Sequence, residues 1–261
     1  MEITILGCGP SYGIPTARFG FGGCNPNNPK NIRTRTGLLI SENGTNVLID
    51  TPPELRQQLY SANIQKVDAV IWTHMHADHV MGIDDVRIYT RNTVGVGEEV
   101  IPLPVYIHEK DWEEFQQRFS FYLKPFEYLK QPVPPFETHL IKAGECISIK
   151  GIEFLPILQN HTSCLTLGFK VGSFAYNTDL TDFVEFDIEN LKGIDLWILD
   201  CVTTRYNDKH IYLEKALQWF DIVKPKKMVL THLGAKMDYD TISAQLPKGV
   251  ELAYDGMKLT V

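Results

Sequence analysis

The stretch Thr73-His74-Met75-His76-Ala77-Asp78-His79 decides the fold of this 261-residue chain. It directly follows the apolar run 68–73, which predicts a buried strand. In extended backbone the side chains alternate with a period of two, so His74 and His76 point the same way as the chain leaves the strand. If the chain then turns into a helix, Asp78 and His79 come back beside them. Four ligands within six residues can therefore hold two neighbouring metal ions.

Imidazole and carboxylate ligands in this mixture suit Zn²⁺, and Mn²⁺ or Fe²⁺ are also compatible with them. The alternative interpretation is a histidine-rich surface loop without a metal. A surface loop has no need of the buried strand that precedes His74, and chance matches to this spacing are rare. The sequence therefore favours a metal site.

Three further ligand candidates follow other apolar runs, at the carboxyl ends of predicted strands, where sites on α/β scaffolds gather. His161 follows the run 153–158, Asp179 follows 174–176 and His232 follows 228–230. Any one of them alone would be interpreted as a structural residue with satisfied hydrogen bonds. In this order after the first motif, they complete a predicted set of seven metal ligands.

The composition favours one globular domain, which we expect to span residues 1–261. Hydrophobic residues make up 44% of the chain, enough for a sizeable core. The formal net charge is −7 and long basic runs are absent, so we expect a small substrate and no long nucleic acid.

Cysteine usage and the N-terminal residues bear on the compartment. Five cysteines without a CxxC pair predict free thiols in a reducing environment. The first residues resemble no export signal, and no apolar stretch approaches the roughly 20 residues that span a bilayer. We therefore expect a cytoplasmic protein without a membrane partner.

Short β-favouring runs bounded by turn residues predict most of the elements. Helices are expected at 53–60, 109–119 and 211–223, and the Gly- and Val-rich residues 91–101 are expected to form a mobile loop. This pattern predicts an α/β fold, an αββα sandwich of two mixed β-sheets flanked by helices. The predicted strands are 3–6, 37–40, 46–49, 68–73, 105–108, 147–149, 153–158, 166–171, 174–176, 196–199, 228–230 and 258–261.

With these ligands in this order, the sequence resembles the metallo-β-lactamase superfamily over essentially the whole chain. The resemblance implies two divalent ions, zinc or manganese, or else iron. It places the first at His74, His76 and His161 and the second at Asp78, His79 and His232, with Asp179 bridging both. It also implies that Asp50 lies behind the site and orients a ligand histidine. The alternative for Asp50 is an acid at the N-terminus of the following helix.

The number of residues between the motifs limits which branches of the superfamily the chain can resemble. Only 29 residues follow His232 and 52 separate it from Asp179, which leaves no room for an added helical, nuclease or flavodoxin domain. The chain then resembles the compact phosphodiesterases, which include tRNA 3′-processing nucleases and phosphoribosyl cyclic phosphodiesterases. The glycine-rich turn 6–15 fits this branch, and the lack of a basic arm disfavours tRNA. Because Cys24 stands alone and Ala235 replaces a histidine, we expect no structural zinc site.

Further residues are assigned by the resemblance to the cyclic phosphodiesterases. His210 falls where those enzymes have a histidine that faces the substrate phosphate, and it could protonate the leaving oxygen. The alternative is a surface histidine in a first helical turn. Ser11 and Arg87 are candidates for substrate binding, although Arg87 could instead pair with Asp84 or Asp85. Aromatic residues between 119 and 136 could line a pocket or belong to the core.

The sequence thus predicts a dinuclear phosphodiesterase that hydrolyses a small cyclic or nucleotide-like phosphate ester by metal-bound hydroxide. Asp78 and Asp179 would act as catalytic ligands and His210 as the general acid. Two alternatives are an accessory protein of cofactor biosynthesis with the same fold and a lactone or thioester hydrolase. A homodimer is left open.

Overall fold

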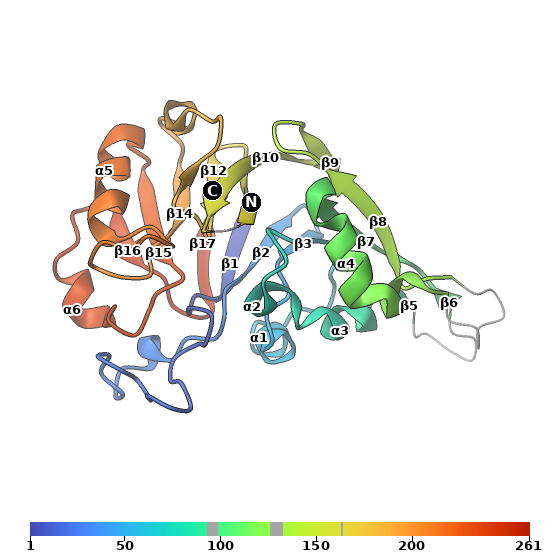
Figure 1. Cartoon of the computed structure of the whole chain (residues 1–261), viewed down its shortest axis with the longest axis horizontal. Coiled ribbons are helices and arrows are strands. Elements are labelled where there is room, and N and C mark those ends of the chain that lie inside the picture. Colours follow the sequence, from blue (N-terminus) through green and yellow to red (C-terminus); the bar gives the residue numbers. More distant parts are fainter. Residues whose placement is uncertain (93–98, 126–132, 163) are drawn as a thin grey trace.

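The structure, a computed structural model, describes residues 1–92, 99–125, 133–162 and 164–261. In this part of the chain, two β-sheets pack face to face and helices cover their outer sides (Figure 1). No helix within it combines the length and the apolar character that a membrane crossing requires. The predicted αββα sandwich is confirmed.

The first sheet has the strand order β17-β1-β2-β3-β4-β7-β8. The pairs between β17 and β3 are antiparallel, and those from β3 to β8 are parallel, so the sheet is mixed. Its strands are β1 (Glu2–Gly7), β2 (Gly37–Glu42), β3 (Thr45–Ile49), β4 (Ala69–Ile71), β7 (Leu103–His108), β8 (Phe136–Ile141) and β17 (Met257–Thr260).

The second sheet has the order β13-β10-β11-β12-β14-β15-β16, with β9 also paired to β10. The pairs from β12 to β16 are parallel and the others antiparallel. Its strands are β9 (Ile147–Ile149), β10 (Ile152–His161), β11 (Cys164–Val171), β12 (Phe174–Asn177), β13 (Asp182–Phe183), β14 (Leu196–Asp200), β15 (Lys227–Thr231) and β16 (Val250–Leu252). A separate pair joins β5 (Arg91–Asn92) to β6 (Glu99–Val100).

Helices α1 to α4 pack on the first sheet, and α5 and α6 lie beside the second (Figure 1). The α-helices are α1 (Leu55–Ser61), α2 (Ala77–Val80), α3 (Ile83–Val86), α4 (Trp112–Phe119), α5 (Leu213–Val223) and α6 (Tyr239–Ser243). Short 3₁₀ turns are η1 (Pro29–Asn31), η2 (Arg87–Thr90), η3 (Glu109–Asp111), η4 (Ser120–Leu123) and η5 (Ile188–Leu191).

Strand alternation divides the apolar residues of the first sheet between two cores. On β2, Leu38 and Ile40 face the second sheet, whereas Leu39 faces the helices α1 to α4. On β3, Val47 packs toward the second sheet and Leu48 packs toward the helices α1 to α4. Because successive side chains point to opposite faces, an apolar run becomes a strand that is buried on both sides.

The two ends of the described chain lie side by side (Figure 1). β1 and β17 are antiparallel neighbours, so Met1 faces the last residue. The Met1 nitrogen donates to the carbonyl oxygen of Val261 at 3.0 Å, and the Val261 N–H donates to the Met1 carbonyl oxygen at 3.0 Å.

Several element boundaries differ from the expectations. The strand expected at 68–73 is shorter, because β4 ends at Ile71 before the chain continues extended toward His74. The helix expected at 211–223 begins at Leu213, and the helix expected at 109–119 begins as the 3₁₀ turn η3. The loop expected at 91–101 starts in β5 and ends after β6, which pair with each other, and its residues 93–98 lie outside the described residues. Of the aromatic residues between 119 and 136, Phe126 and Tyr128 also lie outside the described residues.

The core between the sheets sets a first prediction. Phe169 is fully buried there and packs edge to face on Phe154, with ring centroids 6.3 Å apart. Replacing Phe169 with Ala should lower the free energy of unfolding by about 3–5 kcal/mol, because contacts are lost and a cavity remains. Urea denaturation measures the change. The matched control is Tyr60→Ala, which should cost less than about 0.5 kcal/mol because Tyr60 is 87% exposed. Similar losses in both variants would contradict this assignment of the core.

Candidate active site

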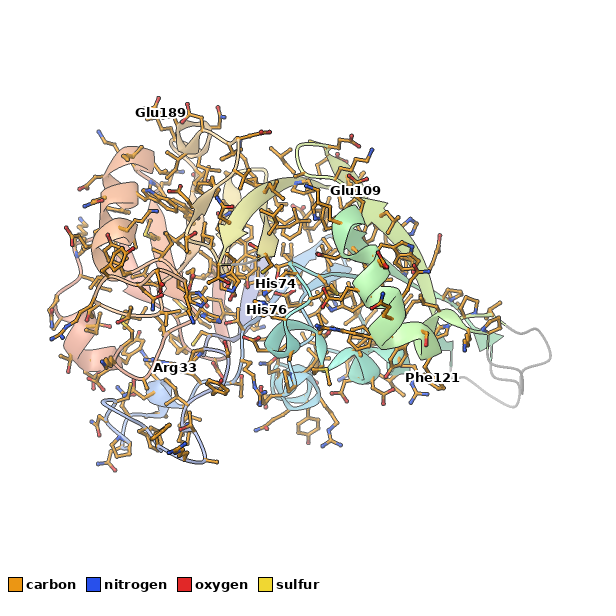
Figure 2. All side chains as sticks on the ribbon, viewed as in Figure 1. Arg33, His74, His76, Glu109, Phe121 and Glu189 are labelled. Atoms are coloured by element: carbon orange, nitrogen blue, oxygen red, sulfur yellow. The ribbon has the colours of Figure 1, made fainter. Side chains whose placement is uncertain are left out.

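The loop after β4 brings four of the predicted ligands together. His76 is in extended conformation, with φ −66° and ψ 149°, and serves as the N-cap of α2. His74 and His76 consequently lie on one side, with ring centroids 4.4 Å apart. The turn of α2 then returns His79 to 4.4 Å from the His74 ring. Figure 2 shows His74 and His76 near the centre of the molecule.

The other three ligand candidates stand at the ends of strands in the second sheet. His161 is the last residue of β10, Asp179 follows β12 and His232 follows β15. Asp179 and His232 have φ of 52° and 55°, and Asp50, which follows β3, has φ of 66°. Non-glycine residues rarely adopt this left-handed conformation, which costs about 1–3 kcal/mol each and is frequent in active sites.

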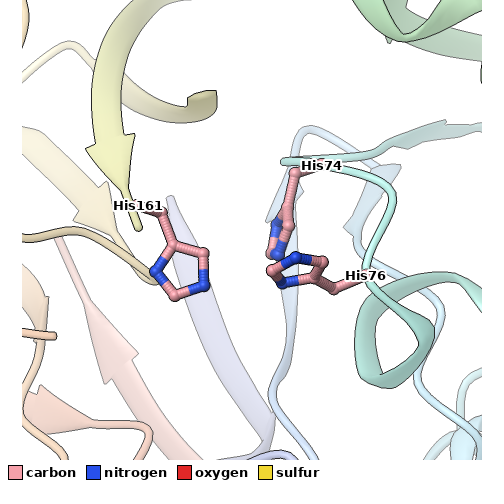
Figure 3. A group of neighbouring side chains, drawn as sticks. All are labelled: His74, His76 and His161. Atoms are coloured by element: carbon pink, nitrogen blue, oxygen red, sulfur yellow. The ribbon is translucent and has the colours of Figure 1, made fainter. Parts of the chain in front are cut away.

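The seven candidates form two neighbouring groups. His74, His76 and His161 make the first, and their ligand atoms lie within 4.8 Å of one another. Figure 3 shows these three rings turned toward a common space. Asp78, His79 and His232 make the second group on the same criterion.

Asp179 lies between the two groups. Its Oδ2 is 3.0 Å from His79 Nε2, and its Oδ1 is 3.6 Å from His232 Nε2 and 3.7 Å from His161 Nε2. One carboxylate therefore reaches both groups, as the sequence predicts for a bridging ligand.

The ring nitrogens that face the centre make no well-directed hydrogen bond. Among the buried side chains that the structure describes, Nε2 of His74, His79 and His232 has no hydrogen-bond partner in good geometry. The carboxylates of Asp78 and Asp179 lie 3.0–3.8 Å from the last two nitrogens. Burying a polar atom without a partner costs free energy, so three such atoms at one place point to a missing ligand. Imidazole nitrogens and carboxylate oxygens in this number fit divalent metal ions.

The pKa shifts of four ligand candidates suit metal binding. Burial lowers the pKa of His74 and of His161, which favours the neutral imidazole that binds metals. Burial works against ionisation of Asp179, but His232 and His79 outweigh it and hold its pKa well below the usual range. Hydrogen-bond partners at His232 and His79 likewise keep the pKa of Asp78 low despite its burial. The carboxylates are therefore ionised, as metal ligands must be. Burial also lowers the pKa of His79, but Asp179 and Asp50 outweigh burial and raise that pKa well above the usual range, and bound cations would act in the opposite direction.

Partners behind the ligands fix the orientation of their rings. Asp50 Oδ2 lies 2.7 Å from His79 Nδ1, and Asp50 also accepts from the backbone N–H of Thr73 at 2.8 Å. The Thr73 hydroxyl lies 2.9 Å from His74 Nδ1. His161 Nδ1 is 3.0 Å from the carbonyl oxygen of Lys209. With Nδ1 occupied in each case, Nε2 is the nitrogen that faces the centre.

Asp50 thus stands where the resemblance places it, behind a ligand histidine. The alternative, an acid at the start of the following helix, does not describe its position, because the N-cap of α1 is Glu54.

His210 lies beside both metal-ligand groups. Its Nδ1 is 2.9 Å from Asp200 Oδ2 and 3.9 Å from Asp179 Oδ1. Its ring centroid is 4.7 Å from that of His161 and 4.9 Å from that of His232. Burial lowers the pKa of His210, but Asp200 outweighs burial and raises that pKa to about 9. Bound cations would act in the opposite direction.

The surroundings of His210 correct one expectation. The residue is not in a first helical turn, because α5 begins at Leu213 with Tyr212 as its N-cap. Its backbone N–H instead donates to Asn207 Oδ1 at 3.2 Å. Asp200 was not predicted as a site residue, although it ends the apolar strand β14 and the rule that identified Asp179 would have found it.

The two proposed substrate-binding residues lie differently. Arg87 Nε is 2.9 Å from Asp84 Oδ1, so the structure shows the ion pair that the sequence offered as the alternative. Ser11 follows β1 in a turn, and no contact of its side chain with a ligand candidate is found among the described residues. Substrate binding by either residue stays a prediction.

Two residues near the ligands carry no signal in a sequence motif. Arg118 on α4 donates from Nη1 to the carbonyl oxygen of Met75 at 2.5 Å, between two ligand histidines. Cys164 at the start of β11 has its sulfur 3.7 Å from His76 Nε2, and burial raises the pKa of this thiol to about 11. Both reach the site through tertiary packing.

Hydrogen bonds connect the neighbours of Cys24 to the segment after His232: the Gly23 N–H donates to the Ala235 carbonyl oxygen at 2.8 Å and the Asn25 N–H donates to Asp238 Oδ2 at 2.9 Å. The buried Arg33 donates from Nη2 to the carbonyl oxygen of Met237 at 2.7 Å and to Asn31 Oδ1 at 2.9 Å. Asn31 Nδ2 donates in turn to Asp238 Oδ2 at 2.8 Å. Arg33 lies at the lower left of the molecule in Figure 2. The network ties the segment around Cys24 to the residues that follow His232.

Comparison with known proteins identifies the family. Residues 45–233 match the family described as a β-lactamase superfamily domain, and this range includes all seven ligand candidates. The chain belongs to the β-lactamase superfamily. The resemblance noted in the sequence is therefore confirmed.

Three similar proteins refine the placement within this superfamily. A crystal structure of a diphosphatase from the PhnP family has a TM-score of 0.88 and 30% identity, covering 100% of this chain and 97% of that one. A probable metallo-hydrolase, YhfI of Bacillus subtilis, is 27% identical over 77% of this chain and 72% of its own length. An octanoyltransferase of Porphyromonas gingivalis is 29% identical over 100% of this chain, which spans only 52% of that relative.

The superfamily and these relatives support a metal-dependent hydrolase. The activity named for the octanoyltransferase belongs to a protein about half of which has no counterpart here. Metal ions are implied by the family and fit the His and Asp clusters.

Asp179 provides the prediction for this site. Because this carboxylate reaches both ligand groups, Asp179→Ala should lose bound metal from both positions and lose hydrolysis with it. Elemental analysis of the purified variant measures the metal. The control is Asp195→Ala. Asp195 directly precedes β14, at the end of the strand away from Asp200 and the site, and its carboxylate pairs with Lys226 at 2.7 Å. This variant should keep the metal content of the wild type. Full metal content in Asp179→Ala would contradict a bridging role.

Proposed function

We propose that the chain hydrolyses a phosphodiester or diphosphate bond in a small substrate with the help of two divalent ions. One observation carries the proposal: the His210–Asp200 pair lies beside the two ligand groups and contacts the residues of both. We propose zinc or manganese, or else iron, as the ions.

The two ions, when bound, would activate a water molecule and neutralise charge on the phosphoryl oxygens. Asp179 and Asp78 contribute ionised carboxylates to the ligand sets, and Asp50 holds the ring of His79 in position. This division of labour needs no protein nucleophile.

His210 is suited to supply the proton that the leaving oxygen needs. Attack by water breaks a phosphorus–oxygen bond, and the leaving oxygen requires a proton. Since Nδ1 of His210 lies against Asp200, Nε2 is the nitrogen that can carry this proton. Asp200 fixes the ring and favours its protonated form. We therefore propose His210 as the general acid and Asp200 as its positioning residue.

The substrate class follows from charge and similarity. The net charge of −7 disfavours a long nucleic acid as the substrate and favours a small anion bound at the metals. The similar protein of the PhnP family is a diphosphatase, so the bond broken there joins two phosphates. Diester and diphosphate hydrolysis share the same displacement at phosphorus, and a proton on the leaving oxygen assists both, more strongly where an alkoxide leaves. A lactone or thioester substrate would give His210 no comparable role.

Hydrolysis by a His210 variant tests the proposal. The metal-loaded protein should hydrolyse bis-p-nitrophenyl phosphate, whose p-nitrophenolate leaves without a proton, and a phosphodiester with an alkoxide leaving group. On the alkoxide substrate, His210→Ala should lower kcat by a factor on the order of 10²–10⁴, and on bis-p-nitrophenyl phosphate it should lower kcat much less. Its metal content should not change. Asp200→Asn should reduce kcat less, because the ring remains although its orientation weakens.

The matched control is His139→Ala, on β8, whose ring is half-buried and stacks on Tyr106, away from the ligand candidates. It should keep wild-type kcat. If His210→Ala hydrolysed the phosphodiester with an alkoxide leaving group at the wild-type rate, the general-acid assignment would be wrong. If the metal-loaded wild-type protein cleaved only a thioester or a lactam, the proposed bond class would be wrong.

A further inference from the structure

The ligand histidine His76 differs from its neighbours in the partner behind its ring. His74, His79 and His161 have their outer nitrogens against oxygen atoms, those of Thr73, Asp50 and Lys209. His76 instead has Nε2 at 3.7 Å from the sulfur of Cys164. A ligand imidazole normally donates its other N–H to a partner that fixes the ring, and sulfur can accept such a bond weakly.

Cys164 is placed for this contact by the sheet. It is the first residue of β11 and pairs across the ladder with His161, the last residue of β10. Its sulfur also lies 3.3 Å from the carbonyl oxygen of His161 and donates its S–H there. The lone pairs of the same sulfur can then accept from His76. One thiol thus connects two members of the His74, His76 and His161 group.

We propose that Cys164 is a positioning residue for His76 and, through it, for the metal at His74, His76 and His161. Holding Nε2 of His76 against the sulfur leaves Nδ1 as the ring nitrogen that faces the other two histidines. The thiol acts from behind the ligand and does not itself bind the ion. This inference rests on the proposed function, because it requires metal at that group.

The geometry suits sulfur better than a smaller atom. Contacts of 3.7 Å to His76 and 3.3 Å to His161 are compatible with sulfur and long for oxygen. A serine hydroxyl has a shorter bond to Cβ and the shorter hydrogen-bond range of oxygen, so it can serve one partner well and not both. Alanine serves neither.

Metal affinity tests the positioning role, because a residue that only stabilises the fold would not change the affinity of one metal position. Wild type, Cys164→Ala and Cys164→Ser are titrated with Zn²⁺ against a chromophoric chelator, which resolves two binding constants. Cys164→Ala should weaken one constant about 10-fold or more and leave the other unchanged, in line with partners behind metal ligands elsewhere. Cys164→Ser should fall between alanine and wild type. Cys146→Ala, which removes an exposed free thiol, should match wild type.

The outcomes separate this inference from the proposed function. Wild type that binds no divalent ion would overturn both. Wild type that binds two ions, with Cys164→Ala and Cys164→Ser binding both equally well, would overturn the inference alone. An equal loss in Cys146→Ala would also overturn it, because that residue does not contact His76.

Cobalt spectroscopy adds a test of how the sulfur acts. The Co²⁺ form of the wild type should lack the near-ultraviolet sulfur-to-metal charge-transfer band. Its presence would show that Cys164 is a direct ligand and overturn the positioning role. Equal melting temperatures of the metal-free wild type and Cys164→Ser would support an effect on the metal position and not on folding.

Discussion

The site depends on one constraint: polar atoms that are buried where two sheets meet must find partners. The ends of β4 in the first sheet and of β10, β12 and β15 in the second converge on the same place. β4, β12 and β15 are almost wholly buried, and β10 ends in the buried His161, so the side chains at these strand ends are withdrawn from water. Imidazole and carboxylate groups in that position can be satisfied by hydrogen bonds behind them together with cations in front of them.

Much of this arrangement could be predicted because strand ends are visible in a sequence. An apolar run followed at once by His or Asp located His161, Asp179 and His232, and alternation placed His74 and His76 on one side. The two-sheet sandwich followed from the order of the runs. Element boundaries were predicted less well, because tertiary contacts determine where an element ends. β4 ends at Ile71 and α5 begins at Leu213, each two residues from the expected boundary.

The rest could not be read from the sequence, because it depends on which surfaces meet. Arg87 has the chemistry of a phosphate ligand, yet Asp84 three residues earlier takes it as an ion-pair partner. Arg118 reaches the ligand loop only because α4 packs over it, and nothing in its neighbourhood along the chain indicates this. Asp200 was within reach of the strand-end rule, but its role appears only with His210 beside it.

The pairing of β1 with β17 has a topological consequence. Because Met1 and Val261 exchange backbone hydrogen bonds, a short linker could join them without moving either strand. New ends could then be opened at the exposed turn around Asn43 and Gly44, between β2 and β3. The ligand residues, from His74 to His232, would keep their places in space and their order, while β1 and β2 would follow them in the chain instead of preceding them. The geometry of the site therefore depends on which strands are neighbours and not on where the polypeptide ends lie among them.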